Sequence, residues 1–198
     1  MNAEPLHAVD GFNLPEEYRV LLRPDEAETD FRGNIHRLPR FFYEIGGWQE
    51  ARDIRVAPHF TVAELMLVDC REGRLLLSQF PHYVPCAIVL LARVLEDFRR
   101  EVNAPVFISA NGGYRSPVHQ IGGAKSIHAW GTAADIYRIG DTLLNDAKSI
   151  QKFGSMAASL SPAVFVRPFG PEREQTDDHL HIDLGFVRLT PSECSEAR

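Results

Sequence analysis

The strongest constraint on the fold is a strict alternation of side chains over residues 179 to 186. The odd positions there are polar or small, and the even positions are apolar: Leu180, Ile182, Leu184 and Phe186. Because successive side chains of a strand point to opposite faces, the apolar set is expected to face a core. His179, His181 and Asp183 then share the other face, which is expected to contact water, a metal ion or a substrate.

Helical and strand patterns precede this segment and indicate a mixed fold. Over residues 85 to 102, apolar side chains recur at three- and four-residue steps opposite a charged face, which predicts an amphipathic helix. Asp141 is expected to cap a second helix that ends near residue 159. Apolar runs at 106–109 and 163–167 predict strands. We therefore expect an α+β fold, with helices packed on a small, mainly antiparallel sheet and the functional site on the exposed face of that sheet.

Composition excludes several classes of protein. The chain has 198 residues, enough for one well-buried core, and a formal net charge of −6 without a basic stripe, which argues against nucleic-acid binding. Its most apolar run is too short to span a bilayer. Three cysteines without a CxxC pair, Cys70, Cys86 and Cys194, argue against a zinc site built from thiolates. No secretory signal is visible, so a cytoplasmic location is expected, with action in the periplasm or cell wall possible by another route.

The first 57 residues form the least regular part of the sequence. Prolines punctuate them, and charges of both signs alternate without a sustained period. Five aromatic residues within positions 31 to 48 nevertheless favour packing over disorder. We therefore expect an N-terminal extension, residues 1–57, packed on a domain formed by residues 58–198.

Two further stretches carry residues that suit metal chemistry. His128 and Asp135 are seven residues apart, which on one helix would separate them by about 10 Å along the axis. Gly131 between them also disfavours a continuous helix. A loop that leads into a strand would instead fold His128 back beside Asp135, and His181 would arrive from a distant strand. Such a trio of nitrogen and oxygen ligands is typical of catalytic zinc, which keeps a further position open.

The ordered motifs resemble those of a known family. They are Tyr114-Arg115-Ser116-Pro117, then Ser126-x-His128-x-x-Gly131-x-Ala133-x-Asp135, then Asp178-x-x-His181. This pattern is similar to that of zinc-dependent D-Ala-D-Ala carboxypeptidases and their relatives, which include vancomycin-resistance dipeptidases, phage endolysin peptidases and the metal-binding Hedgehog signalling domain. The resemblance covers roughly residues 58 to 189.

The resemblance implies a role for each motif residue. The implied zinc ligands are His128, Asp135 and His181. Asp178 would be the general base, and Arg115 would hold a substrate carboxylate or stabilise the developing oxyanion. Ser126 would form a hydrogen bond with the substrate peptide. Asp183 is a suitable partner for the free N–H of a ligating imidazole.

The resemblance also implies a function. It is that of a bacterial or phage zinc metallopeptidase, a carboxypeptidase or an endopeptidase, which hydrolyses short peptides containing D-amino acids, such as the peptidoglycan stems of a cell wall. The alternative is a metal-binding interaction domain of the same fold without turnover, as in the Hedgehog branch. The scissile bond and the oligomeric state stay open.

Two residues compete for the role of base. The resemblance indicates Asp178, which stands just before the predicted strand. The alternation places His179 on the same face as His181, so that His179 is an alternative base or a donor to the transition state. His119 is expected on the surface or at the rim of the site, and Trp130 is expected to pack.

Overall fold

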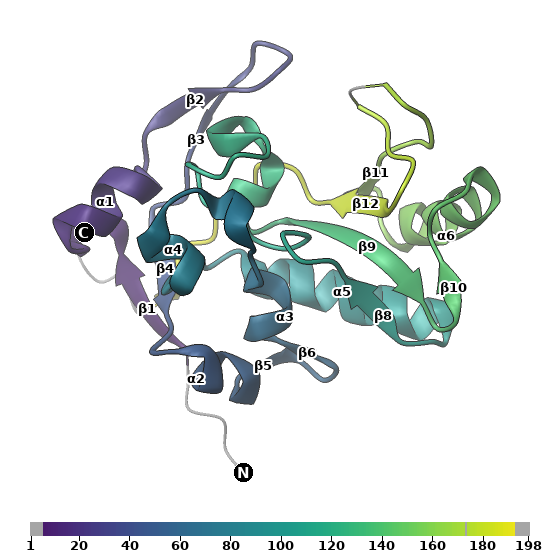
Figure 1. Ribbon diagram of the computed structural model, residues 1–198, viewed down its shortest axis with the longest axis horizontal. Helices are drawn as coiled ribbons and strands as arrows, with labels where there is room; N and C mark the ends of the chain where they lie inside the picture. Colours follow the sequence, from purple (N-terminus) through teal and green to yellow (C-terminus); the bar gives the residue numbers. More distant parts are fainter. Residues whose placement is uncertain (1–5, 173, 193–198) are drawn as a thin grey trace.

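A five-stranded antiparallel sheet lies at the centre of the computed structural model, which describes residues 6–172 and 174–192 (Figure 1). The strand order is β10-β9-β12-β11, and β8 also pairs with β9. The strands are β8 (Val106–Ile108), β9 (Ala133–Ile139), β10 (Thr142–Leu143), β11 (Phe165–Val166) and β12 (Leu180–Asp183). All of their pairings are antiparallel, in agreement with the α+β expectation.

The pairing of β9 with β12 divides their side chains between two faces. His181 lies opposite Asp135, and Ile182 lies opposite Ala134. Leu180, Ile182 and Ile136 belong to the main hydrophobic core. His181, Asp183 and Asp135 therefore share the other face, as the alternation predicts.

Two long helices cover the core face of the sheet. α5 (Ile88–Val102) contacts β9, and α6 (Ala147–Leu160) contacts β11 and β12. Leu91, Leu95 and Phe98 of α5 are fully buried in this core. Gly154 permits the close approach of α6, because a Cβ there would lie 3.1 Å from the side chain of Val166.

A second, three-stranded sheet is built from distant parts of the chain. Its order is β1 (His7–Asp10), β4 (Phe41–Glu44) and β7 (Tyr83–Pro85), and α1 (Glu16–Leu22) packs against it. A smaller core lies here, formed by Leu14, Tyr18, Leu22, Phe42, Leu77 and Tyr83. Residues 6–57 thus pair with residues beyond 57, and whether 58–198 folds as a separate domain stays a prediction.

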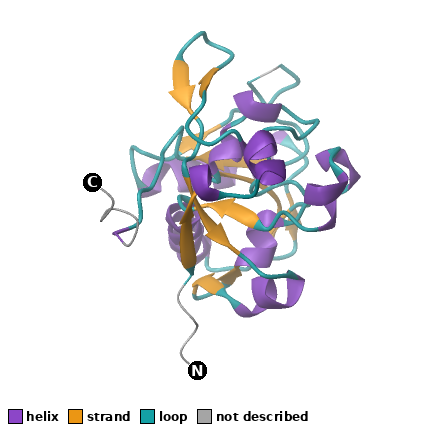
Figure 2. Cartoon of the chain, turned by 90° about the vertical axis from the view of Figure 1, so that its left-hand side faces the viewer, coloured by secondary structure: helices purple, strands orange, loops and turns teal. Residues whose placement is uncertain are grey.

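The remaining elements are short. A hairpin of β2 (Ala27–Thr29) and β3 (Ile35–Arg37) projects from the body of the molecule (Figure 1, Figure 2). The others are α2 (Trp48–Asp53), β5 (Arg55–Ala57), β6 (Phe60–Thr61), α3 (Val62–Met66) and α4 (Leu75–Gln79). In the parts of the chain that the structure describes, no helix has the length and apolar character needed to span a membrane. Cys70 is exposed and Cys86 is buried, while Cys194 lies outside the described residues.

Both long helices begin later than expected. Pro85 belongs to β7, at the edge of the three-stranded sheet, where its missing N–H costs little, and α5 begins at Ile88. Asp141 does not cap α6, because Thr142 and Leu143 turn back to pair with β9. Asp146 is the cap instead, and its side chain accepts a hydrogen bond from the backbone of Ser149.

The site face of the sheet is covered, whereas an exposed face was expected. His181 is 1% exposed and Asp135 is 7% exposed. Residues 111–131 fold over this face, and the β2–β3 hairpin is anchored beside them: the Trp130 indole donates to the carbonyl of Arg37. Because this face is covered, its polar and charged side chains are buried and pair with one another instead of with water.

The turn at residues 111–113 sets the position of this cover. Asn111 has φ 58°, in the left-handed region, and the carbonyl of Gly112 accepts a hydrogen bond from the backbone of Asp135 at 2.7 Å. A Cβ at Gly113 would lie 2.1 Å from the carbonyl oxygen of Leu65. Only glycine therefore fits at residue 113 without a shift of the backbone.

We predict that Gly113→Ala lowers the free energy of unfolding by at least about 3 kcal/mol, because two backbone segments must separate. Urea denaturation of the metal-free protein measures the loss. Gly47→Ala is the matched control, since a Cβ there meets nothing within 4 Å. Equal stability of the two variants would contradict the close packing of this turn.

Candidate metal centre

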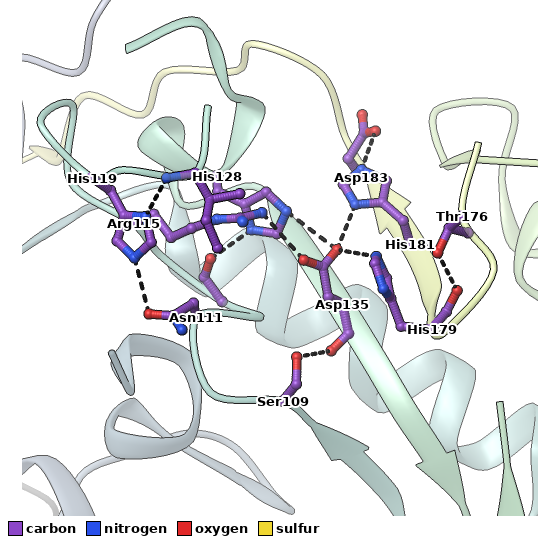
Figure 3. A network of polar contacts seen from close by, with 12 residues as sticks. Ser109, Asn111, Arg115, His119, His128, Asp135, Thr176, His179, His181 and Asp183 are labelled. Atoms are coloured by element: carbon purple, nitrogen blue, oxygen red, sulfur yellow. Dashed lines mark hydrogen bonds and ion pairs between the residues drawn. The ribbon is translucent and has the colours of Figure 1, made fainter. Parts of the chain in front are cut away.

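Three side chains from separate elements converge on one point below the cover (Figure 3). His128 lies in a 3₁₀ turn (Ile127–Trp130), Asp135 in β9 and His181 in β12. One donor atom from each lies within 4.8 Å of the others. The structure thus brings together the three residues that the sequence analysis selected as ligands, and their donor set suits a metal ion.

The orientation of His128 follows from a single hydrogen bond. Its Nδ1 lies 2.7 Å from the carbonyl oxygen of Gly113. A carbonyl can only accept, so Nδ1 carries the proton and Nε2 has a free lone pair. Nε2 is buried, makes no hydrogen bond, and lies 3.3 Å from Oδ1 of Asp135. A cation bound at this point would give a partner to the buried lone pair and to the carboxylate that faces it.

His181 is held in the same manner by a different partner. Its Nε2 lies 3.0 Å from Oδ2 of Asp183, and its Nδ1 lies 2.7 Å from Oδ1 of Asp135. Asp183 is fixed in turn, because its Oδ1 accepts a hydrogen bond from the backbone of Gly185 at 2.8 Å. With Nε2–H donating to Asp183, Nδ1 presents a lone pair to the same point as His128 Nε2.

The electrostatics favour the protonation states that metal ligands need. Burial lowers the pKa of His128 to about 4, and the charge of Arg115 contributes in the same direction. Burial alone would raise the pKa of the Asp135 carboxyl, but its contacts with His128, His179 and His181 outweigh burial and hold that pKa well below the usual value. A neutral imidazole and a carboxylate therefore face each other near pH 7.

Arg115 contacts the other oxygen of the same carboxylate. Its Nη2 lies 3.2 Å from Oδ2 of Asp135, which leaves Oδ1 to face the two histidines. Burial lowers the pKa of the guanidinium, and the charge of Asp135 opposes that effect. Its Nε is buried and makes no hydrogen bond.

A cavity of about 570 Å³ opens beside this centre. Five residues of the segment 121–127 line it: Ile121, Gly122, Lys125, Ser126 and Ile127. The β2–β3 hairpin also lines it, through Phe31, Asn34 and other residues of 30–36. An ion pair joins the hairpin to the loop before β12: Arg32 Nη2 lies 3.0 Å from Glu174 Oε2, and a second nitrogen contacts Oε1. The N-terminal region therefore forms a wall of the cavity.

The two candidates for the base lie in different environments. The side chain of Asp178 is 79% exposed and contacts Nδ1 of His179 at 2.5 Å. Nε2 of His179 lies 3.3 Å from Oδ1 of Asp135 and lines the cavity. Burial lowers the pKa of His179, but the carboxylates of Asp135 and Asp178 outweigh burial and raise it overall. His179 is thus nearer to the candidate ligands than Asp178 in this conformation.

His119 is buried, although a position on the surface or at the rim of the site was expected. Its Nδ1 accepts a hydrogen bond from the backbone of Ile121 at 3.0 Å, so Nε2–H donates to Oδ1 of Asn111 at 2.9 Å. Burial, followed by the charge of Arg115, lowers its pKa to about 4. His119 therefore ties the loop after Arg115 to the turn at 111–113. No periodicity marks such a residue, because its partners are brought together only by the folded loops.

The low pKa of His119 makes stability depend on pH. An unfolded histidine has a pKa of about 6.5, so between pH 6.5 and 4 the unfolded chain binds the extra proton. The stability is complete above pH 6.5 and falls as the pH approaches 4. We predict that His119 accounts for about 2 kcal/mol of the loss between pH 7.5 and 5.

Urea denaturation of the metal-free protein at both pH values tests this prediction. His119→Gln should show a smaller loss than the wild type, while the exposed His7→Gln should behave as the wild type. An undiminished loss in His119→Gln would refute the assignment.

A comparison with known proteins agrees with this geometry. A family model described as Peptidase M15 matches residues 58–183, just under two thirds of the chain, and the match spans the candidate ligands, the turn at 111–113 and the long helices. No curated protein and no solved structure matches the chain. Because the family model matches more than half of the chain, the chain belongs to the peptidase M15 family.

Proposed function

We propose that this protein is a zinc-dependent metallopeptidase that hydrolyses short peptides containing D-amino acids, such as peptidoglycan stems, on a fold like that of the D-Ala-D-Ala carboxypeptidases. The observation that carries the proposal is the convergence of His128 Nε2, Asp135 Oδ1 and His181 Nδ1 beside a peptide-sized cavity. The substrate class rests on the resemblance of the three motifs, and the membership of the peptidase M15 family supports it.

The donor set fits zinc in a catalytic setting. The proposed ligands are two imidazoles and one carboxylate, and such a set of three leaves a position for water or substrate. When bound there, zinc acts as a Lewis acid and lowers the pKa of a coordinated water to about 7. The carbonyl of Gly113 and the carboxylate of Asp183 hold the two imidazoles in the required tautomers.

Asp178 is the proposed general base. A carboxylate next to the attacking water takes its proton and returns it to the leaving amine. The side chain of Asp178 is exposed, so a rotamer change that turns it towards the cavity needs no rearrangement of the core. His179 contacts a carboxylate through each of its nitrogens, an arrangement that suits a donor to the developing oxyanion.

Arg115 and Ser126 are the proposed substrate contacts. Arg115 lies beside Asp135 and lines the cavity, so its guanidinium can donate to the oxygen that gains charge during the reaction. Ser126 lines the cavity and can form a hydrogen bond with the peptide backbone.

The alternative is a domain that binds metal without turnover. The buried ligands alone are compatible with it, since a structural site needs only the metal and its ligands. The open cavity beside the centre favours the enzyme, because a purely structural zinc site is closed.

Hydrolysis assays with defined metal content test the proposal. The protein is stripped with a chelator, reloaded with one equivalent of zinc, and assayed on peptides with D-Ala-D-Ala and L-Ala-D-Glu bonds. We expect turnover in the reloaded protein only. Asp178→Asn should lower kcat by at least about 100-fold while the zinc content is unchanged.

Asp177→Asn is the matched control, because Asp177 is the exposed neighbour of Asp178 and should leave kcat unchanged. His179→Gln should lower kcat and retain zinc. If Asp178→Asn keeps most of its activity while His179→Gln loses it, the base is His179. Absence of turnover on every peptide with a full complement of zinc would refute the peptidase proposal in favour of the binding domain.

A further inference from the structure

Arg167 stands next to the candidate metal centre in the register of the sheet. In the pairing of β11 with β12, Val166 lies opposite Ile182, and the backbone N–H of Arg167 donates to the carbonyl of His181 at 3.2 Å. His181 in turn lies opposite Asp135. Cross-strand neighbours share a face, with Cβ atoms about 5 Å apart. Arg167, His181 and Asp135 therefore form one row on the cavity face.

The charge of Arg167 is not matched by a carboxylate. Two other arginines that line the cavity have acidic partners: Arg32 pairs with Glu174, and Arg115 pairs with Asp135. Among the residues described here, the guanidinium of Arg167 has no ion pair or hydrogen bond, although it also lines the cavity.

A second guanidinium lines the same cavity: Arg115 Nη2 lies 3.2 Å from Oδ2 of Asp135, which neutralises its charge. The guanidinium of Arg167 therefore remains available to an anion that enters the cavity. The planar fork of a guanidinium matches a carboxylate through two parallel hydrogen bonds.

The spacing indicates which carboxylate fits. One residue of an extended peptide spans about 3.5 Å. Arg167 is one strand away from His181, about 5 Å between Cβ atoms, and its long side chain covers part of the distance towards the cavity. A carboxylate held by Arg167 would therefore lie about one residue beyond a carbonyl positioned at the metal centre.

We propose that Arg167 binds the C-terminal carboxylate of the substrate one residue beyond the scissile bond, so that the protein removes single C-terminal residues as a carboxypeptidase. The inference rests on the proposed function, because it assigns the mode of cleavage at the same site. Arg167 is then a specificity-determining residue, distinct from the proposed ligands and base.

Paired substrates test this inference. N-acetyl-Lys-D-Ala-D-Ala is assayed as the free acid and as the C-terminal amide. The zinc-loaded wild type should cleave the acid with kcat/KM about 10- to 100-fold above the amide, the range expected for a lost charge-assisted contact. Arg167→Gln should lower kcat/KM for the acid to the level of the amide and leave the amide value within about twofold. Arg167→Lys, which keeps the charge without the fork, should be intermediate.

Arg93→Gln is the matched control, since Arg93 is exposed on α5, and it should retain the preference for the acid. An acid and an amide cleaved equally well by the wild type would overturn the inference, as would an Arg167→Gln variant that loses both activities equally. A peptide amide with a side-chain carboxylate in its last residue gives a third arm. If it is cleaved as well as the free acid, and only when Arg167 is present, the anion is a side chain and the carboxypeptidase assignment is wrong.

A binding measurement separates this inference from the proposed function. If neither peptide is hydrolysed, the peptidase proposal fails. Calorimetric titration of the metal-free protein with the acid and the amide still decides the role of Arg167. Tighter binding of the acid, lost in Arg167→Gln, supports it. Equal affinities, or no binding of the acid, contradict it.

Discussion

The pairing of His181 with Asp135 across β12 and β9 is the constraint on which the rest of the site depends. A slip of one residue by either strand would turn its own site residue, His181 of β12 or Asp135 of β9, towards the hydrophobic core and bring a neighbour, Ile182 or Ala134, to the cavity. The core prevents that slip, because Leu180, Ile182 and Ile136 are buried against α5 and α6. The apolar face thus determines the position of the polar face. His128 needs no place in the sheet, since the carbonyl of Gly113 aims its ring at the same point.

The N-terminal region contributes to the site, although the family match does not include it. The family match begins at residue 58, yet the β2–β3 hairpin forms a wall of the cavity. It is anchored by the Trp130 indole and by the stacking of His36 on Phe186, with ring centroids 3.6 Å apart. The exposed ion pair between Arg32 and Glu174 is a weak contact of a kind worth at most about 1 kcal/mol. The hairpin is therefore held firmly at its base and lightly at its tip.

The sequence predicted those parts of the structure that depend on local periodicity. The alternation at 179–186 indicated both faces of β12, and the motif around His128 and Asp135 selected residues that the fold does bring together. The starts of α5 and α6 were misplaced, because tertiary pairing drew Pro85 into β7 and Thr142 into β10. The covered site and the buried His119 could not be predicted, because each depends on contacts between loops that are distant in sequence and carry no period of their own. The strand that ends near Arg167 was predicted, but its pairing with β12, which places Arg167 beside His181, was not.

The central claim is that His128, Asp135 and His181 hold one zinc ion. X-ray absorption at the zinc edge of the reloaded protein tests it most directly. The account predicts one zinc per chain, with the scattering signature of two imidazoles and with nitrogen and oxygen ligands at about 2.0 to 2.2 Å. A sulfur ligand at about 2.3 Å, or a first shell without imidazole scattering, would contradict it.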